Sequence, residues 1–214
     1  MARKRKKMNQ KNEKIEKREF AFDVTATEEG NHITGRPIVY NAPTIVGGIF
    51  REVFEPGALN KTDLKDVPLL VGHDRSAIPV ARSRRNNGNS TMQLTPGPEG
   101  LDIDASLDVA NNDQAKALYS AVKRQDISGM SAAFTVEEEE WTELDTDMPT
   151  RHIRSVSKVY EVSAVTFPAY EQTSLVARSA GEALESAKAA LERARAEERD
   201  SIVRDEIRKM IKGE

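Results

Sequence analysis

The sequence contains no cysteine and only three histidines, His32, His73 and His152, in 214 residues. Without cysteine the chain can form no disulfide, no thiol nucleophile and no cysteine-ligated zinc or iron–sulfur site. The histidines are too widely separated in sequence to form a local metal-binding motif. We therefore predict neither a metal nor another cofactor.

Long apolar runs are also missing. No uncharged stretch approaches the roughly 20 residues that a membrane-spanning helix needs. The N-terminus is basic, but the residues after Met8 are polar and lack the apolar stretch of a secretion signal. These absences predict a soluble, intracellular protein without a membrane partner.

The net charge of −3 conceals three segments of different character. Residues 1–19 carry a net charge of +6, residues 20–178 carry −8, and residues 179–214 carry −1. A segment as basic and as poor in aliphatic side chains as 1–19 buries too little surface to offset its ordering entropy, so we expect a mobile arm. The remaining length suits one domain of ordinary size, which we place at 20–178.

Short runs with a period of two residues, bounded by glycine, proline and asparagine, predict strands in this domain. They lie at 20–27, 33–40, 50–57, 67–73, 91–95, 101–107, 127–136 and 158–167. Residues 110–123 instead follow helical spacing, with Asn112 or Asp113 as the N-cap. We treat the acidic stretch 137–149 as the separator between the last two strands. This pattern predicts a mainly β (α+β) fold, a closed or nearly closed antiparallel barrel with one internal helix.

Residues 179–214 are rich in alanine, glutamate and arginine and predict one long C-terminal helix. Its apolar stripe is thin and imperfect. Such a stripe suits a partner helix or a partly exposed arm better than a core helix, although a fully solvated charged helix has the same pattern.

Three separate segments could carry chemistry. His73 ends an apolar strand, Ser131 lies between small neighbours on a strand, and Glu161 points from a strand into a mostly apolar surface. A serine, a histidine and a carboxylate are the components of nucleophilic acyl transfer, in which the imidazole takes the serine proton and the carboxylate orients the imidazole.

Each of these residues also has a purely structural explanation. His73 could bond to Asp74 or to the backbone, and Ser131 could relieve crowding between strands. Glu161 could pair with Lys158 or with an arginine of a neighbouring strand. Spacing alone does not decide between these explanations and a catalytic triad.

Six motifs occur in a fixed order along the chain. They are Ile33-Thr-Gly-Arg-Pro-Ile-Val-Tyr-Asn, Glu52-Val-Phe-Glu-Pro-Gly-Ala-Leu, Leu70-Val-Gly-His-Asp, Gly100-Leu-Asp-Ile-Asp-Ala, Ile127-Ser-Gly-Met-Ser-Ala-Ala-Phe and Tyr160-Glu-Val-Ser-Ala-Val-Thr-Phe-Pro-Ala. In this order and at these separations, the sequence resembles the prohead (capsid-maturation) serine proteases of tailed phages from about Phe20 to Ala177. That family is related in fold to the herpesvirus assembly protease, assemblin.

The resemblance implies a barrel in which Ser131 is the nucleophile and His73 is the general base. We favour Glu161 as the third member, with His152 and Asp74 as rivals. The chain departs from the family pattern at Ala132-Ala133, where an aromatic residue and a glycine often follow the serine. Ser128 is a weaker candidate nucleophile. Sequence does not define the oxyanion hole, and we note Arg151 and Arg154 as candidates for it.

The resemblance further implies a serine endopeptidase that cleaves scaffold segments or the N-terminal extension of the major capsid protein. It would act inside the procapsid in the host cytoplasm and would cleave itself. A catalytically silent scaffold protein on the same fold is the alternative. A nucleic-acid-binding barrel is a third hypothesis, suggested by the basic arm and disfavoured by the acidic body. The sequence leaves open whether the chain forms a homo-oligomer.

Overall fold

The computed structural model describes residues 15–20, 24–27, 31–166 and 180–212, which form two β-sheets and two helices. The strands of the first sheet are β1 (Glu16–Phe20), β4 (Thr44–Val46), β5 (Phe50–Phe54), β6 (Pro68–Val71), β7 (Ala81–Arg82), β10 (Gly129–Thr142) and β11 (Thr150–Val165). Those of the second are β2 (Thr25–Ala26), β3 (His32–Val39), β8 (Met92–Pro96) and β9 (Gly100–Ser106). The helices are α1 (Asp113–Lys123) and α2 (Ala180–Lys212). The predicted mainly β fold with helices is thereby confirmed.

The strand pairings correct the barrel prediction in two respects. In the described part of the chain they form two separate sheets, with the orders β1-β10-β11-β5-β4 and β2-β3-β9-β8, and they do not close into a barrel. The sheets are also not purely antiparallel, because β11 pairs in parallel with both β5 and β6. Alternating patterns show which face of a strand is buried, but they do not specify its neighbour or its direction.

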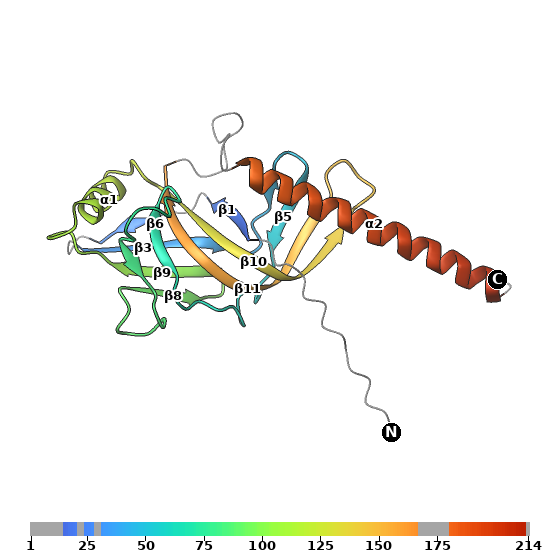
Figure 1. The fold of residues 1–214 in the computed structure, drawn as a ribbon, viewed down its shortest axis with the longest axis horizontal. Coiled ribbons are helices and arrows are strands. Elements are labelled where there is room, and N and C mark those ends of the chain that lie inside the picture. The colour runs from blue at the N-terminus through green and yellow to red at the C-terminus, as the bar shows by residue number, and fades with distance from the viewer. Residues whose placement is uncertain (1–14, 21–23, 28–30, 167–179, 213–214) are drawn as a thin grey trace, which may run out of the picture.

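The two longest strands, β10 and β11, form a hairpin that curves across the molecule in Figure 1. It corrects our treatment of residues 137–149, because β10 continues through the acidic run to Thr142. Two glutamates of this run form ion pairs across the hairpin: Glu139 with Arg151, and Glu140 with Arg154 at 2.5 Å. Cross-strand charge pairs hold this part of β10, and it has no apolar face. The sequence therefore shows no alternation of apolar and polar residues there, which is the pattern used to predict strands.

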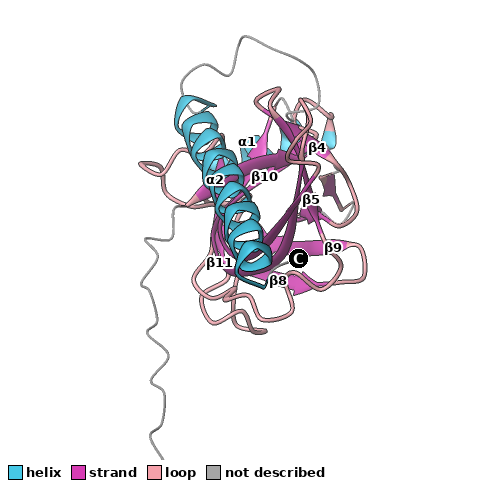
Figure 2. Ribbon diagram, turned by 90° about the vertical axis from the view of Figure 1, so that its right-hand side faces the viewer, coloured by secondary structure: helices cyan, strands magenta, loops and turns pink. Residues whose placement is uncertain are grey.

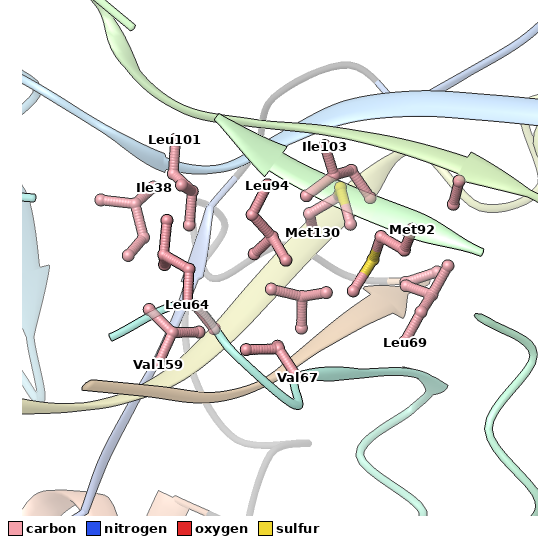
Figure 3. Packing of buried hydrophobic residues seen from close by; sticks show 14 of the residues in the cluster. Ile38, Leu64, Val67, Leu69, Met92, Leu94, Leu101, Ile103, Met130 and Val159 are labelled. Carbon is pink, nitrogen blue, oxygen red and sulfur yellow. The ribbon is translucent and has the colours of Figure 1, made fainter. Parts of the chain in front are cut away.

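The main core lies between the two sheets. Figure 3 shows Met92, Leu94 and Ile103 of the second sheet facing side chains of the first sheet and its loops, among them Leu69 and Met130. All five of these side chains are buried. The predicted alternation on β10 is confirmed, because every second residue from Met130 to Phe134 joins this core while Ser131 and Ala133 do not.

Both helices occur where the sequence predicted them. Asn112 caps α1, since its side chain accepts hydrogen bonds from the backbone N–H groups of Gln114 and Ala115. Helix α2 runs along one side of the sheets and extends beyond them (Figures 1 and 2). Ala190 and Leu191 are buried, whereas the residues from 196 to 211 are exposed, so α2 is a partly exposed arm. In the described residues no helix is long and apolar enough to cross a membrane.

The end of the predicted mobile arm is ordered as strand β1, which pairs with the edge of β10. A buried ionic network fastens it. Arg18 contacts Glu52 at 2.5 Å and Glu16 at 2.6 Å, while Arg151 bonds to Glu16, Glu52 and Glu139. Charges this deeply buried are stable only when each finds a partner. The pairing therefore explains why a basic segment with little apolar surface folds onto the sheet.

The network predicts acid sensitivity. Burial alone would raise the pKa of Glu16, but Arg151 and Arg18 hold that pKa at about 2. Because the folded pKa lies below the unfolded one, Glu16 stabilises the fold fully above about pH 4.5, and this contribution is lost as the pH falls toward 2. Glu16→Gln should lower the unfolding free energy at pH 7 by about 3–5 kcal/mol and weaken its decline between pH 5 and 2.

Chemical unfolding followed by circular dichroism across this pH range measures both effects. Glu99→Gln is the matched control, because Glu99 is 70% exposed in its pair with Arg36 and should change stability by less than about 1 kcal/mol. Equal acid sensitivity in wild type and Glu16→Gln would contradict the prediction.

Candidate active site

Three neighbouring strands bring the predicted catalytic residues to one region of the first sheet. Ser131 on β10 lies directly opposite Ser163 on the central strand β11, and Ser163 in turn aligns with Leu70 on β6. The pairing of β6 continues past its end, because Gly72 N–H donates to the carbonyl of Ala164 at 3.0 Å. His73 therefore follows a strand that is anchored beside the predicted nucleophile and carboxylate.

A β-bulge sets the direction of Glu161. Ala133 pairs with Glu161, but the next residue, Phe134, pairs with Val159, so Tyr160 is an extra residue in β11. The bulge reverses the alternation, as bulges do when they re-aim a side chain. Val159, which a regular strand would place on the same face as Glu161, lies in the core instead. Glu161 shares the face of Ser131 and Ser163, and only 1% of it is exposed.

His73 lies in a tight turn with an unusual backbone. Gly72 and His73 have φ angles of 59° and 63°, and the N–H of Asp74 donates to the carbonyl of Val71 at 3.2 Å. Two successive left-handed residues are typical of a type I′ turn. A histidine in this conformation is strained relative to glycine, and such strain concentrates at functional sites.

The turn places the imidazole directly against Glu161. The Nδ1 atom of His73 lies 2.6 Å from Oε1 of Glu161, and Nε of Arg75 lies 2.7 Å from Oε2. Burial alone would raise the pKa of Glu161, but the hydrogen bonds from His73 and Arg75 keep it below its ordinary value. An ionised carboxylate only accepts hydrogen bonds, so Nδ1 donates, and in the neutral ring Nε2 is then the basic nitrogen.

Sequence reasoning missed Arg75 as a component of this site. Its side chain is 52% exposed and reaches back to a carboxylate that is almost fully buried. The only available signal was its position two residues after His73 in an unpaired turn, which does not distinguish it from any surface arginine.

The other candidates have partners elsewhere. Nδ1 of His152 lies 2.7 Å from Glu55, and His152 precedes Glu161 by nine positions of β11, roughly 30 Å of extended strand. Asp74 is exposed and accepts hydrogen bonds from Ser76. Arg151 belongs to the buried ionic network and Arg154 pairs with Glu140, so neither lies where our oxyanion-hole suggestion needed it.

Ser131 is fully buried, and its hydroxyl is directed toward β1. Its Oγ donates to the backbone carbonyl of Arg18 at 2.8 Å, where β1 pairs along β10. In the described part of the chain no hydrogen bond joins Ser131 to His73. The structure thus brings His73 and Glu161 into direct contact and places Ser131 on the same face, with its hydroxyl held by a neighbouring strand. Ser128 is exposed and precedes β10.

The model of the caudovirus prohead serine protease family matches residues 19–186. The chain belongs to this family. Membership assigns it to the bacteriophage hydrolases that act as serine proteases in capsid maturation. A prohead protease would act on capsid or scaffold proteins of a procapsid in the host cell. No curated protein and no solved structure matches the chain, so the relationship to the herpesvirus assembly protease stays a prediction.

The turn that carries His73 should depend on glycine at position 72. A Cβ atom there would meet no atom within 4 Å, so only the left-handed backbone opposes a larger residue. Gly72→Ala should therefore lower the unfolding free energy by about 1–2 kcal/mol without a steric clash. Gly88→Ala is the control, because Gly88 has the same free space and no left-handed φ angle. Chemical denaturation compares the two variants, and equal stabilities would contradict the assigned turn.

Proposed function

We propose that this chain is a serine endopeptidase that cleaves scaffold segments, or the N-terminal extension of the major capsid protein, inside the procapsid. Ser131 is the nucleophile, His73 the general base and Glu161 the orienting carboxylate. The observation that carries the proposal is the 2.6 Å contact of His73 with Glu161 on the sheet face that also bears Ser131. Arg75 supports the arrangement, because its charge helps to keep Glu161 ionised.

The reaction follows from the hydrogen bonds of the site. Nε2 of His73 takes the hydroxyl proton as Oγ of Ser131 bonds to the carbonyl carbon of the substrate. The tetrahedral intermediate then expels the amine, which receives that proton, and leaves an ester on Ser131. Water hydrolyses the ester through the same proton transfers. Glu161 remains ionised throughout, holds the ring by its Nδ1–H and stabilises the imidazolium.

The described conformation corresponds to a resting state in this scheme. The hydroxyl of Ser131 donates to Arg18 and not to His73, and no part of Ser131 is exposed. A substrate carbonyl can reach Oγ only after the hydroxyl leaves the carbonyl of Arg18 and the side chain becomes accessible. Self-cleavage fits this arrangement, because β1 lies close to the basic segment 1–14 in the sequence, and cutting there would weaken the strand that holds the Ser131 hydroxyl. The exposed half of α2 is a second accessible target.

A first experiment tests the nucleophile. Wild type and Ser131→Ala are co-expressed with the major capsid protein, and both chains are followed by mass spectrometry. Ser131→Ala should abolish self-cleavage and capsid-protein processing together, because it removes the only atom that forms the acyl bond. Ser128→Ala is the matched control and should process normally. Wild type should also react with a serine-directed fluorophosphonate at Ser131.

The outcomes separate the alternatives. Loss of processing in Ser128→Ala with retention in Ser131→Ala would move the nucleophile and leave the family assignment intact. A wild type that neither processes nor labels would favour the catalytically silent scaffold protein, which shares the same fold and the same exposed helix.

A second experiment tests the third member of the triad. Glu161→Gln should lower kcat by roughly 10³–10⁴-fold, because the amide no longer favours the Nδ1–H tautomer of His73. His152→Ala should change kcat little, since its partners are Glu55 and Thr142. Steady-state cleavage assays on folded protein measure both variants. A large loss in His152→Ala with normal activity in Glu161→Gln would assign the third position to the histidine.

A further inference from the structure

Ser163 is a fully buried side chain whose hydroxyl has no hydrogen-bond partner in the structure as described. Transferring a hydroxyl from water without replacing its hydrogen bonds is unfavourable, and most buried polar groups in proteins have a partner. A buried hydroxyl without a partner therefore needs an explanation. The fold alone does not supply one, because alanine would fill nearly the same space without this cost.

The location of Ser163 suggests the explanation. It lies directly opposite Ser131 in the antiparallel pairing of β10 with β11, so the two side chains share one face of the sheet. The Cβ atoms of such a pair are about 4.5–5.5 Å apart. Glu161 lies two positions away on the same strand and also faces this side. Ser163 is thus adjacent both to the predicted nucleophile and to the carboxylate that orients its base.

Attack by Ser131 converts the substrate carbonyl oxygen into an oxyanion attached to the same carbon as Oγ. A donor about 2.7–3.1 Å from that oxygen stabilises the transition state strongly when it is already in place and shielded from water. A serine hydroxyl can supply such a hydrogen bond. Directly opposed side chains are close enough that an oxygen on the carbon attacked by one hydroxyl would lie within hydrogen-bond reach of the other.

We propose that the Ser163 hydroxyl donates a hydrogen bond to the oxyanion that forms when Ser131 attacks the scissile carbonyl. The proposal rests on the proposed protease function and adds a catalytic residue to it. Among the described residues of the resting enzyme the Ser163 hydroxyl has no partner, and it gains one only as charge develops on the substrate. Burying the hydroxyl therefore lowers the stability of the folded protein. Its hydrogen bond to the oxyanion forms only in the transition state, where it lowers the barrier.

This role predicts opposite effects on stability and on activity. Ser163→Ala removes an unpartnered polar group, so the unfolding free energy should stay the same or rise. The rate at which p-nitrophenyl acetate acylates Ser131 should fall by roughly 10²–10³-fold, the effect of losing one oxyanion donor. The pH dependence of acylation should not change, because His73 and Glu161 are intact.

Thr44 on β4 provides a matched control. Its Oγ1 is also buried and without a hydrogen-bond partner in the described part of the chain, and β4 lies at the far edge of the sheet from β10. Thr44→Val removes the hydroxyl at nearly constant shape. The unfolding free energy of Thr44→Val should stay the same or rise, as expected for Ser163→Ala. The acylation rate of Thr44→Val should equal that of wild type.

The results distinguish this proposal from the protease assignment. If wild type neither acylates with p-nitrophenyl acetate nor labels with the fluorophosphonate, the protease function fails before Ser163 is considered. If wild type reacts and Ser163→Ala reacts within about threefold of it, the oxyanion role is overturned. A Ser163→Ala protein that is less stable or unfolded also overturns it, because the hydroxyl would then hold the fold together.

Discussion

The register between β10 and β11 is the constraint on which the rest of the site depends. It sets Ser131 opposite Ser163, and the bulge at Tyr160 turns Glu161 to the same face while Val159 enters the core. If the register slipped by one residue, the side chains of the shifted strand would change faces. Its polar side chains would then point into the hydrophobic interior. The alternating core residues from Met130 to Phe134 oppose such a shift, so the packing that stabilises the domain also positions its candidate chemistry.

Buried charge organises two regions of the same sheet in different ways. Near Ser131, one carboxylate is shared between His73 and the half-exposed Arg75. On β1 and its neighbours in the sheet, two arginines and three glutamates form a second network, which holds β1 in place. Both arrangements are buried charges stabilised by opposite charges. The first holds an imidazole in one orientation, and the second holds the strand whose Arg18 carbonyl receives the Ser131 hydroxyl.

The local features that oppose stability gather around one place. His73 has a left-handed backbone, Glu161 is a buried carboxylate on a bulged strand, and Ser163 carries a hydroxyl without a described partner. A sequence selected for stability alone would avoid each of these. These three residues lie close together, on β11 and in the turn after β6. Unfavourable features that gather at one place are expected at a functional site, and this agrees with membership of a protease family.

The sequence by itself determined which faces of most strands are buried, where both helices lie and which three side chains to examine. These follow from local periodicity, capping and ordered motifs, which act over a few neighbouring residues. It did not reveal the strand character of residues 137–142, because exposed charge pairs leave no apolar period. It also did not reveal the open pair of sheets, the parallel neighbours of β11, the partnership of Arg75 with Glu161 or the hydrogen bond from Ser131 to β1. Only the tertiary structure decided these, because each depends on contacts between residues that are distant in the chain. The local sequence of each segment is compatible with several partners and does not select one.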